Sequence, residues 1–557
     1  MTTPVIEQPW QRTRQRVPRH DETVLSVPPL KQAAQHIEDN HQLLDSSGLN
    51  ILGRSLIELR SEARSTLVSL AREYTEALLN QPLADCNSDR IVVSGHQPTL
   101  FHPGVWIKNF ALNQLAQSAG GVGLNLVVDN DNLTSPAIQV PVGTLDRPSR
   151  RPMRFDDDRE AEPWEEARLR NTALFDSFAD RVGQAIRHWG SEPLLDSLWP
   201  TATAFRQHSH SLRDCLTAAR HTTERAWGLQ NLELPLSSVC QTPAFLWFAA
   251  DILQDLPRFR ETHNNVLQEF RRLNRIRSQT HPVPELTAKS PWLEAPFWIW
   301  RQNATQRKRL LVNRNGSELL LSDGDQEIGR VPWSASAHQA GPEAVKALQK
   351  LQHNGIRLRT RALTTTLFAR LCLSDLFIHG IGGAKYDEMT DQIISRFYGI
   401  RAPSFHTVTA TLHLDFAPAH NVTQHDLRRC RSTLRDIQFN PDRHLSPQHH
   451  PEAQALIEEK RELIQQQQAS RQARLEGRVQ KSPSTGYRRL LRFREISRQL
   501  AEFAQDQFHL WDDELRSTRL QLQANEVILN REYAFCLYSR QKLQNLMQSL
   551  ADDGHAN

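Results

Sequence analysis

The chain lacks the features that mark several large classes of protein. Its 557 residues include only six cysteines, which are scattered and form no CxxC pair. This usage fits reduced thiols better than a disulfide framework or a zinc ribbon. No stretch approaches the roughly 18–20 uninterrupted apolar residues of a membrane span. The segment Met1–His20 carries arginines but no apolar run behind them, so it does not resemble a secretory signal. We therefore expect a cytoplasmic protein without membrane contact.

An excess of one sign of charge is lacking too. Lys plus Arg number 67 and Asp plus Glu number 63, so the net charge is only +4. A protein that coats nucleic acid needs a strong basic excess or a basic face, so we expect no nucleic-acid partner. The hydrophobic fraction of 39% is that of a globular chain. The mean hydropathy of −0.56 is low, and Glu-, Gln- and Arg-rich segments after residue 450 account for much of it.

The length suggests three or four domains at roughly 100–200 residues each. Changes in composition and periodicity divide the chain into five segments. These are an N-terminal arm with a helical segment (1–88), the first part of an α/β core (89–295), a small β-rich insert (296–345), the second part of the core (346–445), and a helical hairpin with a tail (446–557).

A strand–helix–strand unit stands near the start of the predicted core. The β-branched run 91–93 is followed by a helix-like stretch over 105–119, a Gly-rich turn, and a second apolar run over 124–128. This order is typical of a βαβ unit and predicts a parallel sheet with a Rossmann-like crossover.

Further elements are expected from periodicity. They are helices over 26–80 and within 155–230, hairpins over 297–331, strands at 232–239, 376–379 and 404–415, and two long helices over 453–479 and 488–522 with a turn at 482–486. Apolar residues in the last helix recur at steps of three and four, which is a heptad-like seam. Such a seam predicts either an intramolecular hairpin or a homodimer through the C-terminal helices.

The first candidate site follows the first strand directly. It contains Gly95, His96, Gln97 and His102, and Lys108 lies one turn into the next helix. Ligands of parallel sheets bind where strands end and helices begin, and free N–H groups there favour anions. A Pro- and Gly-shaped turn with histidines that cap backbone groups is the competing interpretation. Two histidines, glycines and a lysine at one junction favour a phosphate or carboxylate site.

The second candidate is the acidic stretch that ends the next strand, with Asp129 and Asp131. Neighbouring parallel strands end at the same edge, so these carboxylates should lie beside the first motif. There they could hold a ribose, an amine or a metal ion. An Asx turn is an equally good interpretation.

The third candidate comprises Gly382, Gly383 and Lys385, again between an apolar strand and a helix. The spacing matches neither a P-loop nor the dinucleotide fingerprint. A tight structural turn is the alternative.

Arginines form two further groups. Arg357, Arg359 and Arg361 alternate on an expected strand, so they would share one face and could clamp an anion. A solvated strand face is the commoner case. The second group is Arg307-Lys308-Arg309. We expect it to form the solvated rim of a hairpin, with nucleic-acid binding as the less favoured interpretation. No spacing of His, Cys and acidic residues predicts a metal site.

The order of these features resembles the bacillithiol biosynthesis cysteine-adding enzyme (BshC) family. The resemblance rests on the motif at 95–104, the acidic strand end at 129–131, the Gly382-Gly383 pair, the helical hairpin and the closing segment 530–538. It covers most of the chain in order, but the motifs are short. His96-Gln97 stands where the family usually has paired glutamines. This loop is closer to the His-containing loop of nucleotidyltransferases.

The resemblance implies a Rossmann-like, nucleotidyltransferase-like core, an inserted connecting region and a C-terminal coiled-coil hairpin that dimerises. It implies ligation of cysteine to a glucosaminyl-malate, with small-molecule substrates and an undetermined cofactor, for which ATP or another nucleotide is a candidate. His96 and His102 would then stabilise phosphate or an oxyanion, Asp129 or Asp131 would orient an amine or ribose, and Arg361 and Lys385 would neutralise a carboxylate. An enzyme that adenylates a different small acid and a non-enzymatic coiled-coil scaffold are the alternatives.

Overall fold

The computed structural model describes residues 10, 15–84, 89–144, 147–190, 192–446, 448, 450–478 and 483–552. The chain forms two compact units. The first comprises Met1–Val140, Arg150–Asp415 and Arg531–Asn557, and the second comprises Pro141–Ser149 and Phe416–Asn530. The second unit thus begins before residue 446, and the C-terminal segment belongs to the first unit. Every helix among the described residues is too short or too polar to span a bilayer.

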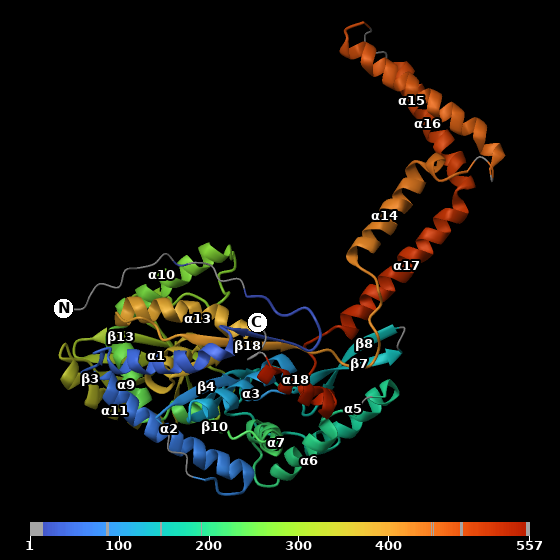
Figure 1. The fold of residues 1–557 in the computed structure, drawn as a ribbon. Coiled ribbons are helices and arrows are strands. Elements are labelled where there is room, and N and C mark those ends of the chain that lie inside the picture. The colour runs from blue at the N-terminus through green and yellow to red at the C-terminus, as the bar shows by residue number, and fades with distance from the viewer. Residues whose placement is uncertain are drawn as a thin grey trace. The chain divides into compact units, whose positions relative to one another are not determined.

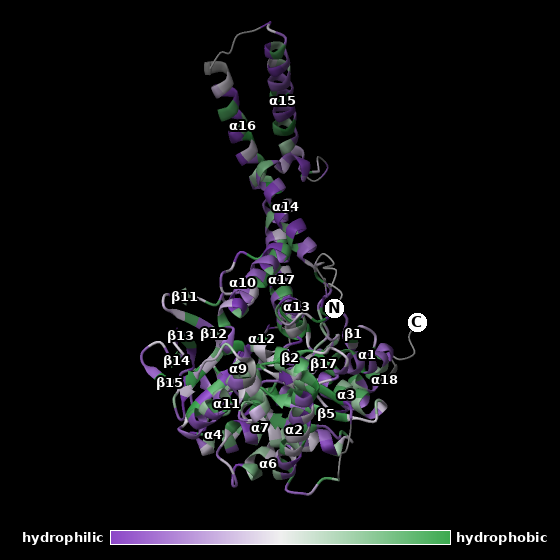
Figure 2. Cartoon of the chain, turned by 90° about the vertical axis from the view of Figure 1, so that its left-hand side faces the viewer, coloured by the Kyte–Doolittle hydropathy of each residue, from purple (hydrophilic) through white to green (hydrophobic). Residues whose placement is uncertain are grey.

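The first unit is a mixed α/β structure built on a mostly parallel sheet (Figure 1). Its strands, in spatial order, are β1 (Thr23–Val27), β18 (Phe405–Thr411), β17 (Leu376–His379), β4 (Ile91–His96), β5 (Val122–Val127) and β10 (Leu232–Pro235). All neighbours pair in parallel except β1, which is antiparallel to β18. Figure 2 shows central strands of this sheet as hydrophobic, which is expected for strands covered on both faces.

The chain changes direction within this sheet between β4 and β17. From β4 it proceeds through β5 to β10 on one side, and it then returns to place β17 and β18 on the other side. The predicted βαβ unit is confirmed, because α3 (Pro103–Ser118) connects β4 to β5, which pair in parallel. Loops after β4 and β17 therefore meet at the carboxyl edge, where open parallel sheets bind their ligands.

A second, antiparallel sheet lies in the same unit. It consists of β11 (Ala288–Lys289), β12 (Trp292–Arg301), β13 (Lys308–Asn315), β14 (Glu318–Ser322) and β15 (Glu327–Pro332), and β16 (Ile356–Thr360) pairs with β12. The expected hairpins over 297–331 are confirmed by these pairings. The two sheets share one apolar core, which extends from Leu124 in β5 to Phe297 in β12.

Helices complete the first unit. The principal ones are α1 (Ala33–Asp45), α2 (Leu56–Leu79), α5 (Phe178–Ile186), α6 (Leu195–Phe205), α7 (Leu212–Ala226), α9 (Pro243–Gln254), α10 (Leu256–Asn274), α11 (Ala337–His353), α12 (Ala362–Phe368), α13 (Ile381–Ile393) and α18 (Arg540–Asp552). α3 packs against β4, β5 and β18. Its Gly104 permits close approach, because a Cβ there would lie 2.2 Å from the carbonyl oxygen of Ala410.

The expectation of helix throughout 26–80 is confirmed for α1 and α2 and is wrong before Leu30 and between these two helices. Gly48, Leu52 and Gly53 adopt left-handed backbone angles, with φ of 61°, 44° and 84°. All three lie between α1 and α2, and Leu52 and Gly53 form the turn of the short hairpin β2 (Asn50–Ile51) and β3 (Arg54–Ser55). The leucine spacing that suggests one long helix is helical only from Leu56 onwards.

The second unit is helical, with α14 (Gln424–Phe439), α15 (Gln454–Leu475), α16 (Pro483–Phe503) and α17 (Gln505–Ile528). The prediction of one helix over 488–522 is wrong, because α16 and α17 are separate at Ala504. α16 packs on α15, whereas α17 packs on α14. The apolar spacing continues through the break because each helix needs a row of apolar residues to pack on its own partner, α15 for α16 and α14 for α17.

The turn expected at 482–486 is also wrong from Pro483 onwards, since α16 begins there. Proline is well tolerated in the first turn of a helix, where its missing N–H group costs nothing. Arg492 of α16 pairs with Glu459 of α15 at 2.7 Å, and Arg489 donates to the carbonyl of Gln466 at 3.1 Å. The order of these contacts shows that α15 and α16 are antiparallel.

Candidate functional site

The loops after β4 and β5 meet at the carboxyl edge of the parallel sheet. The Gln97 side-chain amide donates to Asp131 Oδ2 at 2.8 Å, so the expected proximity of the first and second motifs is confirmed. Asp131 also pairs with Arg307 at 3.1 Å. Arg307 was expected on the solvated rim of a hairpin. It also donates a hydrogen bond to the carbonyl of Asn130 at 2.6 Å. Three separate segments are therefore tied together at this edge.

A pocket of about 260 Å³ opens beside this junction. Gln97, Asp131, Arg307 and Arg361 line it, and so does Trp298 of β12. The guanidinium groups of Arg307 and Arg361 lie 4.7 and 4.8 Å from the Trp298 ring centroid. Cation–π contacts of this kind hold guanidinium groups in place. The predicted residues Gln97, Asp131 and Arg361 thus share one cavity, which we call the edge pocket.

Three charged side chains line the edge pocket, Asp131, Arg307 and Arg361, and Glu294 and Arg309 are paired with this group. Arg361 donates to Glu294 Oε1 at 2.6 Å, and Arg309 to Glu294 Oε2 at 3.1 Å. Glu294 is fully buried. Burial opposes its ionisation, but hydrogen bonds from Thr287 and Arg361 lower its pKa. Asp131 and Arg307 balance each other. Two carboxylates and three guanidinium groups leave one net positive charge.

His263 of α10 also lines the edge pocket. Burial lowers the pKa of His263 to about 4, so its imidazole is neutral at pH 7. Its Nδ1 lies 3.1 Å from Asn264 Oδ1, which makes Nδ1 the protonated nitrogen of the pair. The sequence pattern did not identify His263 or Trp298 as site residues, since each has the spacing of an ordinary core residue of a helix or a strand.

His96 and Lys108 lie deeper at the same edge. The Lys108 ammonium donates to the carbonyl of Gly95 at 2.8 Å, and burial lowers the pKa of Lys108 to about 7. Burial, and next the charge of Lys108, lower the pKa of His96 to about 3. The His96 ring packs edge-on against Phe101, with centroids 5.0 Å apart. His96 is therefore a neutral donor or acceptor, not a fixed cation.

His102 faces the C-terminal segment of the chain and does not line the edge pocket. Its Nε2 lies 3.4 Å from Glu532, and burial, followed by Arg531, lowers the pKa of His102 to about 3. The backbone N–H of Phe535 donates to the carbonyl of Phe101 at 2.8 Å. The segment that contributes to the family resemblance thus covers this side of the first motif.

Asp129 is held in a buried network. It receives the backbone N–H and the hydroxyl of Ser237 at 2.8 and 2.5 Å and pairs with Arg213 at 2.6 Å. Its side chain is fully buried, and burial raises its pKa in spite of Arg213. The structure separates the roles of the two predicted carboxylates, since Asp131 reaches the pocket and Asp129 fixes the strand end.

The third motif begins α13 beside β4. β17 pairs with β4 in parallel, and a Cβ at Gly380 would lie 3.9 Å from the Lys108 side chain. Gly382 and Gly383 are exposed on the first turn of α13, and Lys385 is exposed one step further on. A Cβ at Gly383 would lie 2.8 Å from His379 Nδ1, so glycine is required there for packing.

His379 belongs to a buried network. Its Nε2 lies 2.8 Å from Asp387 Oδ2, and Arg370 pairs with the same carboxylate oxygen at 2.6 Å. Burial opposes ionisation of Asp387, yet Arg370 and His379 hold its pKa well below the usual range. This network fastens the start of α13 to β17.

The alternating arginines do not share one solvated face. Arg357 and Arg359 of β16 both pair with Glu165, at 3.4 and 2.5 Å, whereas Arg361 lies beyond the strand and pairs with Glu294. Arg359 is fully buried. The commoner interpretation of a solvated strand is therefore wrong, because the carboxylate partners come from distant segments that periodicity cannot reveal.

A larger groove of about 810 Å³ lies at the opposite edge of the sheet, where β4 begins. Arg60 and Arg64 line it, and both pair with the buried Asp375 at 2.9 Å. Arg60 also donates to the carbonyl of Leu371 at 2.8 Å. Through Asp375 these arginines hold the start of β17. They lie at the amino edge of the sheet, where parallel sheets seldom bind ligands. We therefore favour the edge pocket despite its smaller volume.

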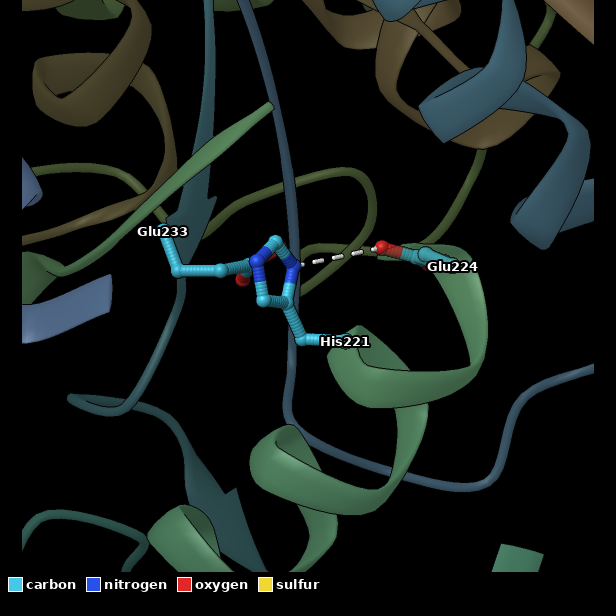
Figure 3. Close-up of side chains that lie close together, drawn as sticks. All are labelled: His221, Glu224 and Glu233. Atoms are coloured by element: carbon cyan, nitrogen blue, oxygen red, sulfur yellow. Dashed lines mark ion pairs between the residues drawn. The ribbon is translucent and has the colours of Figure 1, made fainter. Parts of the chain in front are cut away.

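One group of three potential metal ligands occurs among the described residues, formed by His221, Glu224 and Glu233. Figure 3 shows the imidazole between the two carboxylates. His221 Nδ1 lies 3.6 Å from Glu224 and 3.3 Å from Glu233, and all three side chains are fully buried. Arg220, however, already bridges the two carboxylates, at 2.8 and 2.7 Å.

Donors from other elements complete this cluster. Trp106 and Asn109 donate to Glu224 at 2.6 and 2.7 Å, and Asn125 donates to Glu233 at 2.9 Å. Burial opposes protonation of His221, but hydrogen bonds and charge from Glu224 and Glu233 raise its pKa. This shift favours the protonated form of His221, in which His221 and Arg220 balance the two carboxylates without a metal ion. It joins α3, β5, α7 and β10.

Cysteine chemistry finds no support in the described part of the chain. Five cysteines are described, and all are free and buried. Burial raises the pKa of Cys215, Cys240, Cys372 and Cys536 to about 12, so these thiols are not poised as nucleophiles. Cys86 lies outside the described residues.

A scan against protein-family models and a search of the curated proteins both return no match for this chain.

Proposed function

We propose that the protein is a carbon–nitrogen ligase of the cysteine-adding type, with a Rossmann-like core and its reaction centre at the carboxyl edge of the parallel sheet. Numbered along the chain, the parallel strands stand in the order 3-2-1-4-5, which is that of doubly wound nucleotide-binding folds. The observation that carries the proposal is the convergence of Gln97, Asp131 and Arg361 on one pocket beside this switch point.

The chemistry required of such a ligase fits the groups at the edge. Amide formation needs an activated carboxylate, an oriented amine and donors for the developing oxyanion. Arg361 would hold a carboxylate, and Asp131 and the Gln97 amide would orient the amine. The neutral His96 would accept or donate one hydrogen bond at the end of β4. If ATP activates the carboxylate, the acyl adenylate and pyrophosphate form first, and attack by the amine then releases AMP.

The assay that tests this proposal mixes the protein with cysteine and glucosaminyl-malate, with and without ATP and Mg²⁺, and detects the amide product by mass spectrometry. We expect the His96→Ala variant to lose roughly 100-fold or more in kcat, which is the usual cost of one oxyanion donor. The Arg330→Gln variant is the matched control, because Arg330 of β15 pairs with the exposed carboxylates of Glu318 and Glu327. Absence of product with the wild-type protein under both conditions would reject the cysteine-adding activity.

An enzyme that adenylates a different small acid is the second candidate. It is favoured by the apolar walls of the edge pocket, which include Phe259, Leu286 and Leu367. Exchange of labelled pyrophosphate into ATP in the presence of candidate acids separates this activity from the first. Exchange that cysteine does not stimulate but another acid does would establish it.

We further propose that α15 and α16 form a coiled-coil hairpin through which two chains associate. Large apolar side chains are exposed there, with Leu475, Tyr487, Leu490 and Leu491 between 45% and 76% exposed. Exposed apolar groups of this kind mark association surfaces. Sedimentation of the wild-type protein should give the mass of a dimer, and the Leu490→Glu/Leu491→Glu double variant should give that of a monomer. A monomeric wild type would support the intramolecular alternative.

A further inference from the structure

The edge pocket is polar at one end and apolar over most of its wall. Its apolar part comes from separate elements, with Phe259 on α10, Leu363 and Leu367 on α12, and Ile393 at the end of α13. A nearby loop contributes Leu286. These side chains are each less than 10% exposed. Burial of an apolar body against them is favourable by roughly 25 cal/mol per Å², whereas a sugar hydroxyl placed there would lose its hydrogen bonds to water.

The charged side chains that line the polar end, Asp131, Arg307 and Arg361, sum to one net positive charge. Arg307 is balanced by Asp131, and Glu294 is shared by Arg309 and Arg361. Among the described residues the guanidinium group of Arg361 makes one hydrogen bond, from Nη1 to Glu294, which leaves its other N–H donors for a ligand. One excess charge matches one carboxylate. A dicarboxylate would carry a second negative charge without a counter-ion.

The volume limits the size of the ligand. About 260 Å³ lies just below the range of roughly 300–1,000 Å³ that is usual for pockets for drug-sized molecules. It exceeds the space that a cysteine side chain would fill. The remaining polar groups of the lining carry no charge that would oppose an anion. They are Gln97, Asn130, Thr360, Thr364, Thr365 and the neutral His263.

From these observations we propose that the edge pocket binds a small monocarboxylic acid with an apolar body, with the carboxylate on Arg361 and the body against Phe259, Leu363 and Leu367. This inference rests on the second candidate function, an enzyme that adenylates a different small acid, and it names the class of acid that enters the edge pocket. Its chemistry is that of a branched aliphatic or small aromatic acid without further charges.

Calorimetry without nucleotide tests the inference directly. The probes are 4-methylpentanoate, its neutral amide, leucine, cysteine and malate. We expect 4-methylpentanoate to bind at least tenfold more tightly than any of the others. Equal binding of the neutral amide would show that the carboxylate is not recognised. Tighter binding of leucine would show that Asp131 receives an ammonium group, and tighter binding of malate or cysteine would show a polar site. Each of these three results overturns the inference.

Two variants place the ligand. Arg361→Gln should weaken binding of 4-methylpentanoate at least tenfold, and Leu367→Phe, which keeps every charge, should do the same by filling the cavity. Arg330→Gln on β15 is the control, since Arg330 pairs only with exposed carboxylates. Thermal unfolding checks that each variant is folded. Unchanged binding in Leu367→Phe overturns the inference even if Arg361→Gln does not fold.

The outcome is separable from that of the proposed function. Binding of 4-methylpentanoate in a protein that forms no cysteine amide would reject the cysteine-adding activity and retain the inference. Amide formation from cysteine in a protein that binds none of the apolar acids would do the reverse.

Discussion

The cluster around Arg220 and the edge pocket both gather buried charges, but they differ in how completely those charges are paired. In the cluster, Glu224 and Glu233 receive hydrogen bonds from Arg220 and from donors on α3 and β5, and His221 supplies the balancing charge. At the edge pocket Arg361 keeps free donors, and a cavity of about 260 Å³ lies in front of it.

This difference separates a structural role from a binding role. A buried carboxylate pair with an arginine and a histidine stabilises one arrangement of helices and strands, and its partners are all internal. A charge with one partner and an open, mainly apolar cavity can exchange water for a ligand. The proximity of His221, Glu224 and Glu233 alone would have favoured the cluster as the binding site. How fully the charges are paired is what distinguishes the structural cluster from the edge pocket.

Removal of Arg220 should have the largest effect on stability. In the Arg220→Met variant, Glu224 and Glu233 remain buried without their main counter-ion, and breaking a buried pair in this way costs roughly 3–5 kcal/mol. Urea unfolding measures the loss. The matched control is Arg330→Met, whose side chain is 54% exposed in its ion pairs, and we expect at most about 1 kcal/mol there. Equal losses in both variants would contradict the assignment of Arg220 as the centre of a buried cluster.

The pH dependence of the His221→Gln variant should be the next largest effect. Burial opposes protonation of His221, but Glu224 and Glu233 raise its pKa above the ordinary value of 6.5. Its contribution to stability is therefore present below pH 6.5 and is lost as pH rises through the folded pKa. Glu224 and Glu233 have lowered pKa values, the latter about 2, so their contribution is present above pH 4.5 and is lost as pH falls. The difference in unfolding free energy between wild type and variant should therefore be greatest between pH 4.5 and 6.5.

Urea unfolding of both proteins from pH 5 to 9 gives this difference directly. A loss of about 1–3 kcal/mol is expected at pH 5 to 6, as for other buried groups that lose one partner, and it should shrink at pH 9. A difference that grows with pH would show that His221 is neutral in the folded protein, and the cluster would then carry a net negative charge.

Replacement of Arg361 should affect stability least. Arg309, and Thr287 through its hydroxyl at 2.7 Å, still pair with Glu294 in the Arg361→Gln variant, so the buried carboxylate keeps partners. We expect a loss of no more than about 2 kcal/mol by urea unfolding, within the range for a single hydrogen bond to a charged group. A loss as large as that of Arg220→Met would place Arg361 with the structural charges and not with the binding site.

Local patterns predicted the centre of the fold and part of the site. The βαβ unit and the proximity of Gln97 to Asp131 follow from strand ends and the geometry of parallel sheets. The sequence did not reveal that Asp129 is sealed by Ser237 and Arg213, because those partners are about a hundred residues away in the chain. Trp298 and His263 were missed for the same reason.

The helical unit shows a different limit of periodicity. Apolar residues between Phe493 and Leu522 keep a helical spacing across the break at Ala504, because a seam on α15 and a seam on α14 leave the same mark in the sequence. The hairpin at Asn50–Ser55 was missed for the opposite reason, since Leu49 and Leu52 happen to fit the helical spacing of the residues after Leu56.

The central claim is that substrates bind at the carboxyl edge of the parallel sheet. A crystal structure of the protein soaked with 4-methylpentanoate and ATP tests it most directly. The account predicts ligand density in contact with Arg361 in the edge pocket, next to Gln97. Density in the larger groove beside Arg60 and Arg64 at the opposite edge, with the edge pocket holding only water, would contradict it.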